Sequence, residues 1–197
     1  MTISAVLLAG GQSRRMGRDK ATTLFRGAPL WEIQLELLRQ LQFKEIFISA
    51  RTDPAWRPAD LEFVPDVTPS RGPLSGIAAT LARIATDHLF VIAIDTPLMN
   101  EKYLRSLWAR IEPGSGVVPI IENRAEPLIA IYPRDAELEF RGALAGRDFS
   151  LQPLVRKLIA RGKLRPIEVS GGDRSLFRNL NEPTGLRDDR RLGIGSA

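Results

Sequence analysis

Cysteine is absent from this sequence of 197 residues, and histidine occurs only once. The lack of cysteine excludes a disulfide framework and any thiolate metal site and is compatible with a reducing compartment, so the cytoplasm is the default expectation. Together the two shortages exclude cysteine catalysis and a histidine pair. The single histidine, His88, directly precedes an apolar run, so we expect it at the edge of a strand rather than in catalysis.

Long apolar runs are also missing. The N-terminal run is only a few residues long, has no basic segment before it and is followed by charge, which excludes a signal peptide and a membrane span. The three tryptophans are scattered and do not interleave with basic residues, as they would on a nucleic-acid platform. We therefore expect neither a membrane nor a nucleic acid as a partner.

The composition is that of an ordinary globular protein, with 44% hydrophobic and 26% charged residues. The length favours a single domain over 1–197 with a sizeable core, frayed only at the glycine-rich end GIGSA. A net charge of +5 could attract nucleic acid or a small polyphosphate. The arginines are spread along the chain rather than gathered in one block, which favours the small anionic ligand.

Apolar runs alternate with segments of helical spacing along the chain. We expect strands at 6–8, 46–48, 61–64, 89–94, 116–121 and 127–132, and helices at 29–41, 77–84, 101–111 and 151–161. Because the clearest strands are apolar throughout, this alternation predicts an α/β fold with a mostly parallel sheet that is covered on both faces. Ligands of such sheets bind beyond the carboxyl ends of the strands.

The loop after the first strand, within VLLAGGQSRRMGRDK at 6–20, packs four basic residues into seven positions behind two glycines. Its spacing matches neither the GxGxxG dinucleotide motif nor the P-loop. The glycines would expose backbone groups to a ligand, and Arg14, Arg15 and Lys20 could hold phosphate oxygens. A tight turn with solvated arginines is the plain alternative, and the glycines by themselves leave both open.

Two aspartates follow other predicted strands. Asp95 ends an apolar strand, where it could hold Mg²⁺ together with substrate phosphates, or could be a turn or capping residue before Pro97. Asp66 precedes a loop with Gly72 and Gly76, which could approach a base or could simply punctuate the chain. Both aspartates are therefore candidate ligand contacts at the same edge of the sheet.

Asn179 and Asn181 alternate in RNLN near the C-terminus. If this segment is extended, both side chains lie on one face. Taken alone, asparagines of this kind are more often turn or capping residues.

The string LAGGQSRRMGRDK resembles the signature of the molybdenum cofactor guanylyltransferases, in which LAGG, a small residue, two arginines, Met-Gly and Asp-Lys follow one another. FVPDVTPSRGPLSG resembles the second motif of that family, AIDTPLM its metal motif, and LFRNLNEPTGL its C-terminal Asn-x-Asn-x-Pro segment. The resemblance covers most of the chain and is weakest between about 100 and 174.

The resemblance implies a three-layer, Rossmann-like nucleotidyltransferase fold and the transfer of GMP from GTP to molybdopterin, which yields molybdopterin guanine dinucleotide and pyrophosphate. Such a transfer depends mainly on positioning and on neutralising charge. Lys20 and Arg15 are then expected to offset phosphate charge, and Asp95 to hold Mg²⁺. These three are the implied catalytic residues.

The resemblance also implies a set of nucleotide-contacting positions, in which the LAGG backbone helps to select guanine. The implied set is Leu8, Ala9, Gly10, Gly11, Arg14, Lys20, Ser49, Asp66, Gly72, Gly76 and Asp95. Ser49 departs from the family pattern, because relatives carry a ribose- or base-contacting Asn near this position. Asn179 and Asn181 are expected near the metal or the acceptor phosphate.

Three alternatives stay open at this point. A cytidylyltransferase for the same acceptor and a sugar-1-phosphate nucleotidyltransferase would share the fold, and a non-catalytic protein could bind the cofactor on the same scaffold. The expected partners are GTP and molybdopterin or its molybdenum form, with transient contacts to proteins that deliver or accept the cofactor.

Overall fold

The computed structural model describes residues 1–10 and 19–180. Its central sheet has the strand order β10-β7-β9-β6-β1-β4-β5, with the short β8 paired to β7. The strands are β1 (Ile3–Leu8), β4 (Ile46–Ala50), β5 (Glu62–Pro65), β6 (His88–Ala93), β7 (Gly116–Ile121), β8 (Arg124–Ala125), β9 (Ile129–Pro133) and β10 (Leu164–Glu168). A two-stranded hairpin of β2 (Leu24–Phe25) and β3 (Ala28–Pro29) lies apart from this sheet.

The sheet is mostly parallel, as the sequence predicts. β1 pairs in parallel with β4 and β6, β4 with β5, and β7 with β10, whereas β9 runs antiparallel between β6 and β7. In the register, Leu8 lies opposite both Ser49 and Ala93. The carboxyl ends of β1, β4 and β6 are therefore level at one edge of the sheet.

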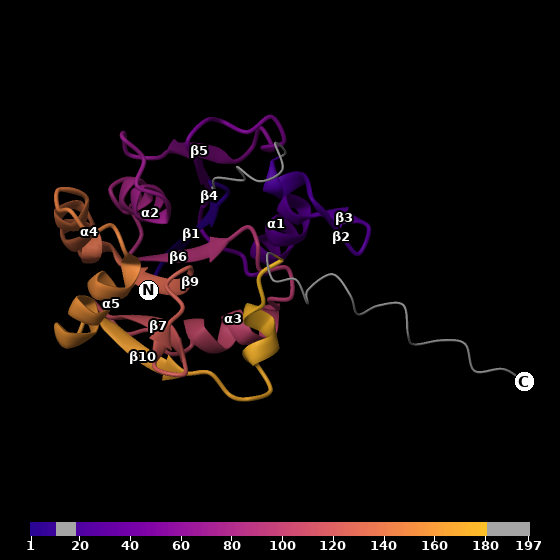
Figure 1. Cartoon of the computed structure of the whole chain (residues 1–197). Coiled ribbons are helices and arrows are strands. Elements are labelled where there is room, and N and C mark those ends of the chain that lie inside the picture. Colours follow the sequence, from indigo (N-terminus) through magenta and orange to yellow (C-terminus); the bar gives the residue numbers. More distant parts are fainter. Residues whose placement is uncertain (11–18, 181–197) are drawn as a thin grey trace, which may run out of the picture.

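Helices cover both faces of the sheet and complete a three-layer fold (Figure 1). The helices are α1 (Leu30–Gln40), α2 (Pro73–Leu81), α3 (Glu101–Trp108), α4 (Glu137–Leu144) and α5 (Leu151–Ala160), with 3-10 turns η1 (Lys20–Thr22), η2 (Arg134–Ala136) and η3 (Arg174–Phe177). α1 and α3 pack on one face, and α2, α4 and α5 pack on the other.

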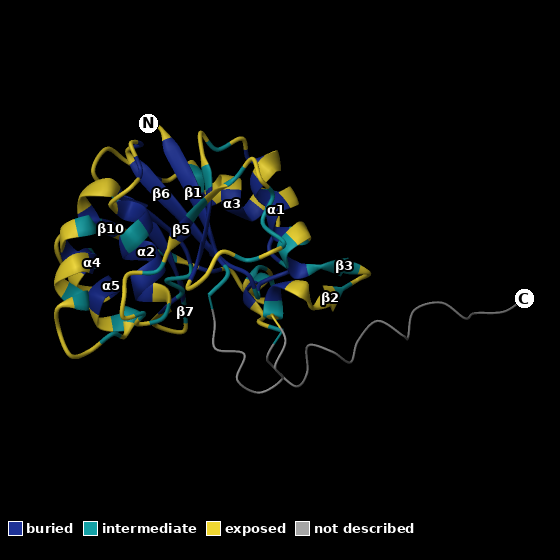
Figure 2. Ribbon diagram, turned by 90° about the horizontal axis from the view of Figure 1, so that it is seen from above, coloured by how far each residue is buried: buried dark blue, intermediate teal, exposed yellow. Residues whose placement is uncertain are grey.

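Strand β1 explains how the two cores form. All six of its residues are buried, and alternate side chains enter opposite clusters: Ile3 and Leu7 join the α1 side, and Val6 and Leu8 join the α2 side. A strand that is buried on both faces needs apolar residues at every position, which is why ISAVLL shows no alternation. Figure 2 shows this buried sheet between helices whose outer faces are exposed.

Several elements differ from the sequence prediction. α4 and β10 were not predicted, and helix α2 begins earlier than the spacing indicated, because Gly72 and Pro73 open it. His88 is the first residue of β6 but is fully buried, and its Nε2 lies 3.2 Å from the carbonyl oxygen of Ser115. The terminal GIGSA lies outside the described residues.

Within 1–10 and 19–180, no helix combines the length and the apolarity that crossing a membrane requires.

Candidate active site

Backbone hydrogen bonds bring the ends of four strands together at the carboxyl edge of the sheet. The N–H of Ala9 donates to the Ser49 carbonyl at 2.9 Å, and the N–H of Ile94 donates to the Leu8 carbonyl at 3.2 Å. At the next strand, the N–H of Asp66 donates to the Ala50 carbonyl at 2.9 Å. The segments that follow β1, β4, β5 and β6 therefore start side by side, in the region where the sequence places its candidate residues.

Gly10 and Gly76 keep this edge free of side chains. A Cβ atom on Gly10 would lie 3.5 Å from the Ala50 Cα and 3.6 Å from Asp66 Oδ2. A Cβ atom on Gly76 would lie only 2.8 Å from Ser49 Oγ, so a larger residue there would push α2 away from β4. Gly72 plays another part: its φ of +70° at the N-cap of α2 is one that glycine adopts at little cost.

Asp66 is held by two serine hydroxyls. Ser70 Oγ donates to Asp66 Oδ2 at 2.7 Å, and Ser49 Oγ donates to Asp66 Oδ1 at 3.4 Å. Ser49 is 1% exposed, so the structure places it behind the Asp66 carboxylate rather than on an open surface. The Ser49 hydroxyl is buried against Gly76 and contacts Asp66, so a side chain as small as serine fits at this position.

A cavity of about 420 Å³ opens beside Asp66 and is also lined by Arg51, Thr68 and Ser70. Sequence reasoning missed Arg51, Thr68 and Ser70. Arg51 directly follows β4, and the signal that could have found it is the same one that points to Asp66 and Asp95: a charged residue at the carboxyl end of a buried parallel strand.

Lys20 and Asp95 form an ion pair although they lie 75 residues apart. The Lys20 Nζ donates to Asp95 Oδ2 at 2.7 Å, and each side chain is 20% exposed. Lys20 begins η1, where the preceding Asp19 accepts a hydrogen bond from the Ala21 N–H at 3.0 Å and so caps the turn. The structure thus brings together two of the three predicted catalytic residues.

The turn that carries Asp95 is fixed from both sides. Thr96 Oγ1 donates to the Ala93 carbonyl at 3.1 Å, and the buried Gln34 of α1 donates to the Thr96 carbonyl at 2.8 Å. The N–H of Leu180 donates to the Asp95 carbonyl at 3.2 Å. Asn179, which is exposed, directly precedes Leu180 in the chain.

Some predicted site residues cannot be placed. Gly11, Arg14, Arg15 and Asn181 lie outside the described residues. Among the residues that are described, no group of three or more His, Asp or Glu side chains could hold a metal ion.

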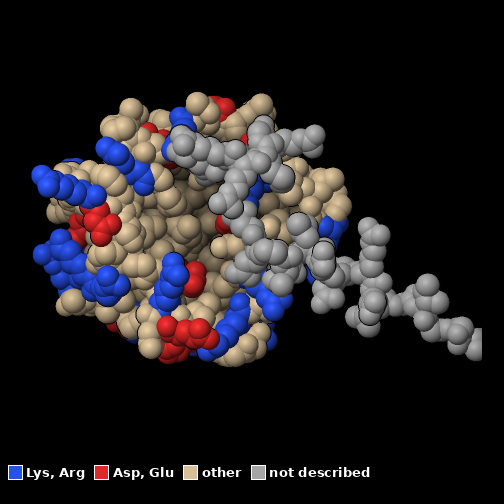
Figure 3. Space-filling view, in the orientation of Figure 1, with Lys and Arg blue, Asp and Glu red and all other residues tan. Residues whose placement is uncertain are grey.

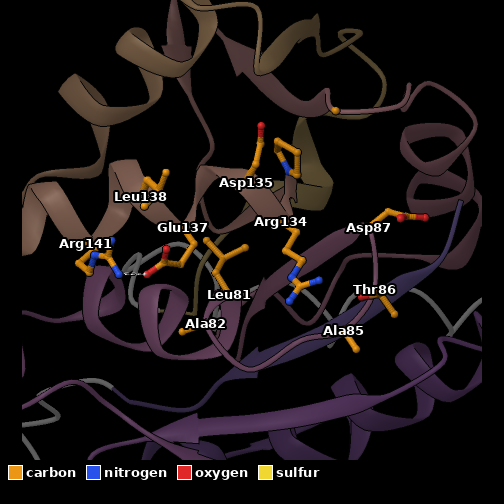
Figure 4. Close-up of a pocket in the computed structure, with 12 residues that line it drawn as sticks. Leu81, Ala82, Ala85, Thr86, Asp87, Arg134, Asp135, Glu137, Leu138 and Arg141 are labelled. Atoms are coloured by element: carbon orange, nitrogen blue, oxygen red, sulfur yellow. Dashed lines mark ion pairs between the residues drawn. The ribbon is translucent and has the colours of Figure 1, made fainter.

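A second hollow, of about 680 Å³, lies at the opposite edge of the sheet, near the residues that precede β6 (Figure 4). Its wall combines the end of α2 with η2 and α4, and includes the Arg141–Glu137 ion pair at 3.4 Å. The smaller cavity includes Asp66 and lies at the carboxyl edge of the parallel strands, where ligands of such sheets bind, so it is the better candidate site.

Comparisons with known proteins show which family and which fold this chain resembles. The family model described as "MobA-like NTP transferase domain" matches residues 5–168. A molybdenum cofactor guanylyltransferase of Syntrophotalea carbinolica is 30% identical over 198 residues, which cover 98% of this chain and 92% of the relative.

Two solved structures share the fold. Molybdopterin-guanine dinucleotide biosynthesis protein A from Archaeoglobus fulgidus superposes with a TM-score of 0.74 at 24% identity, covering 93% of this chain and 94% of the other. A 2-C-methyl-D-erythritol 4-phosphate cytidylyltransferase from Thermus thermophilus superposes with a TM-score of 0.68 at 14% identity, covering 94% and 96%. At these identities the likeness extends to the fold and does not choose the base.

Proposed function

Since this chain belongs to the MobA-like NTP transferase family, we propose that it transfers GMP from GTP to molybdopterin carrying molybdenum and releases pyrophosphate. The product is molybdopterin guanine dinucleotide. The observation that carries the proposal is the Lys20–Asp95 ion pair beside the glycine turn at the carboxyl edge of the sheet. A cation and a carboxylate at one such edge suit a phosphate-bearing ligand and its metal ion.

The guanine base is assigned to the cavity beside Asp66. The guanine edge presents N–H donors at N1 and N2, which match the two oxygens of one carboxylate, whereas adenine presents an acceptor at N1. The serine hydroxyls orient the Asp66 carboxylate, and Gly10 lets a flat ring come close to it. Arg51 adds a donor that suits the guanine O6 and N7 acceptors. Backbone groups from Leu8 to Gly11 complete this selection.

The phosphates are assigned to the side of the site at Lys20. Its ammonium group can exchange Asp95 for phosphate oxygens, and Arg15 and Arg14 supply further positive charge from the same loop. In the reaction, an ionised oxygen of the acceptor's terminal phosphate attacks the α-phosphorus of GTP. The bond from that phosphorus to the bridging oxygen of the leaving pyrophosphate breaks. Because the attacking oxygen is already ionised, the protein needs no strong general base.

A single Mg²⁺ ion fits Asp95. This ion is commonly held by one or two carboxylates together with substrate phosphates and water, so one carboxylate at a strand end is a sufficient protein contribution. Only Oδ2 of Asp95 is engaged by Lys20 in the described structure, which leaves Oδ1 as a ligand atom. When bound, the ion neutralises charge on the phosphates.

The acceptor is assigned to the side of Asp95 that the chain reaches through Leu180. Asn179 and Asn181 are the residues proposed to contact the acceptor phosphate or the metal. Proteins that deliver molybdopterin or accept the finished cofactor would approach this same edge. The chain is proposed to act as one domain over 1–197.

Product analysis tests the function. The purified protein is incubated with molybdopterin, Mg²⁺ and one nucleoside triphosphate at a time, and pyrophosphate and the dinucleotide product are measured. We expect product with GTP. A product formed with CTP instead would make the protein a cytidylyltransferase, and binding without pyrophosphate release would make it a non-catalytic carrier.

A further inference from the structure

Trp56 makes a contact that the proposed chemistry does not yet use. Its indole N–H donates to Asp19 Oδ2 at 2.7 Å, while the other carboxylate oxygen of Asp19 accepts from the Ala21 N–H at 3.0 Å. The two oxygens of Asp19 therefore have separate tasks. One caps η1, which begins with Lys20, and the other ties this cap to the loop that follows β4.

The loop that carries Trp56 is itself well ordered by hydrogen bonds. The Arg57 guanidinium binds both oxygens of Asp53 at 2.7 Å and also donates to the Leu61 carbonyl. This bidentate hydrogen bonding lowers the pKa of the Asp53 carboxyl. Trp56 is thus presented to Asp19 from a fixed turn rather than from a free chain.

Trp31 supports Trp56 from the other side. The two indole rings stack with centroids 5.6 Å apart and planes 14° from parallel, and Trp31 lies in the first turn of α1. Stacking on a helix that packs against the sheet fixes the plane of the Trp56 ring. It also fixes the direction in which the indole N–H points.

We propose that Trp56 is a positioning residue for Lys20, acting through Asp19. This inference rests on the proposed function, in which Lys20 binds the triphosphate. A lysine side chain is long and has many rotamers, so the place of its ammonium group depends on how firmly its backbone is held. The series of contacts from Trp31 through Trp56 and Asp19 to η1 supplies that hold.

The loop that carries Trp56 also extends between two parts of the proposed nucleotide site. The loop starts at Arg51, which lines the cavity assigned to the base, and reaches Asp19, which caps the turn of the lysine assigned to the phosphates. One segment therefore joins the two ends of the proposed nucleotide site. Its geometry sets the separation between base and phosphate contacts.

Trp56→Phe tests the inference, because phenylalanine keeps an aromatic ring on Trp31 but removes the N–H donor. Titration calorimetry with GTP and Mg²⁺ measures the dissociation constant, and we expect it to rise roughly three- to tenfold with the melting temperature nearly unchanged. The control is Trp108→Phe. Trp108 stacks on Phe43 at 5.2 Å and has no contact with Asp19, so the affinity should stay at the wild-type value.

A double-mutant cycle separates positioning from general damage. If Trp56 acts through Lys20, Trp56→Phe should change GTP affinity little in a Lys20→Ala background. Equal losses in both backgrounds would overturn the inference, as would wild-type affinity in Trp56→Phe. Should Trp56→Phe fail to fold, Asp19→Asn replaces it: the amide has one acceptor oxygen and cannot serve both the cap and the indole, so the same non-additive loss is expected.

The two proposals fail differently. GTP affinity does not require transfer, so the cycle reports on Trp56 even if no dinucleotide forms. Lack of product with intact GTP binding would overturn the proposed function alone. An additive cycle in an enzyme that makes the dinucleotide would overturn only the role of Trp56.

Discussion

Two ion-pair sites of this molecule join acidic and basic side chains in different surroundings. At the carboxyl edge, Lys20 donates to one oxygen of Asp95, and both side chains are 20% exposed. On α4, Glu139 is 6% exposed and accepts from Arg161 at 3.0 Å and from Lys163 at 3.2 Å, so each of its oxygens has a partner. A saturated pair holds elements together, whereas a pair with unused ligand atoms at a sheet edge can change partners.

The charged side chains near Glu139 are part of the difference between the two ion-pair sites. Figure 3 shows Lys and Arg side chains gathered over the part of the molecule that carries α4 and α5. Glu139 supplies negative charge beneath them. Burial opposes its ionisation, but the hydrogen bonds from Lys163 and Arg161 outweigh this effect and lower the pKa of its carboxyl. The two ion pairs of Glu139 therefore belong to the scaffold.

Asp95→Ala should have the largest effect on activity, and it therefore tests the difference between the two ion-pair sites most severely. Removing the carboxylate proposed to hold Mg²⁺ should lower kcat by roughly two to three orders of magnitude, as the loss of a main electrostatic group commonly does. The fold should survive, because Asp95 is only partly buried. Steady-state pyrophosphate release and circular dichroism measure the two properties, and near-normal Mg²⁺-dependent turnover would remove Asp95 from the site.

The preference for GTP over ATP should be the second largest effect. A wrong base leaves polar groups near Asp66 and the glycine turn unpaired at about 1 to 3 kcal/mol each, so two mismatches give a preference on the order of a hundredfold. Competition between the nucleotides in the product assay measures it, and Asp66→Asn should reduce it. Comparable kcat/KM for GTP, CTP and ATP would mean that the glycines merely shape a turn.

Lys20→Ala tests the cationic partner of the Lys20–Asp95 ion pair. One charge-assisted contact to phosphate contributes about 1.5 to 3 kcal/mol, so kcat/KM for GTP should fall by roughly ten- to a hundredfold. Arg39→Ala is a matched control, since Arg39 pairs with Asp60 in an exposed contact at 3.4 Å away from the site. If both variants keep the wild-type kcat/KM, Lys20 is an ordinary surface lysine.

The sequence predicts the strands and strand ends at the carboxyl edge better than it predicts α4, for a physical reason. β1 and β6 are continuous apolar runs, and glycines and aspartates directly follow the buried strands, so composition and position coincide. α4 offers no such pattern, because its two buried residues are Phe140 and the charged Glu139. A buried glutamate reads as a surface residue until its cationic partners are known.

Contacts between distant segments also escape the sequence. The Lys20–Asp95 bond and the role of Ser49 behind Asp66 depend on strand order, which periodicity does not encode. Nor does periodicity predict the antiparallel β9. Residue types at strand ends are thus predictable, but the identity of their partners is not.

Glu139→Gln should have the smallest effect on activity and a clear effect on stability. Removing the charge leaves Lys163 and Arg161 without their carboxylate, which should cost about 1 to 2 kcal/mol after allowing for solvent screening of the exposed arginine. Because folding lowers the pKa of Glu139, this stabilisation is complete above its usual value of 4.5 and is lost as the pH falls through the folded-state pKa. Urea titrations of both proteins at neutral and acid pH should show the difference shrinking in acid.

The central claim is that Asp95 serves the reaction and Glu139 serves the scaffold. It is tested most directly by measuring Asp95→Asn and Glu139→Gln side by side for GTP-dependent pyrophosphate release and for thermal unfolding. The account predicts opposite outcomes: Asp95→Asn loses about a hundredfold or more in kcat and keeps the wild-type melting temperature, whereas Glu139→Gln keeps kcat and melts several degrees lower. Retained turnover in Asp95→Asn, or lost turnover in a folded Glu139→Gln, would contradict it.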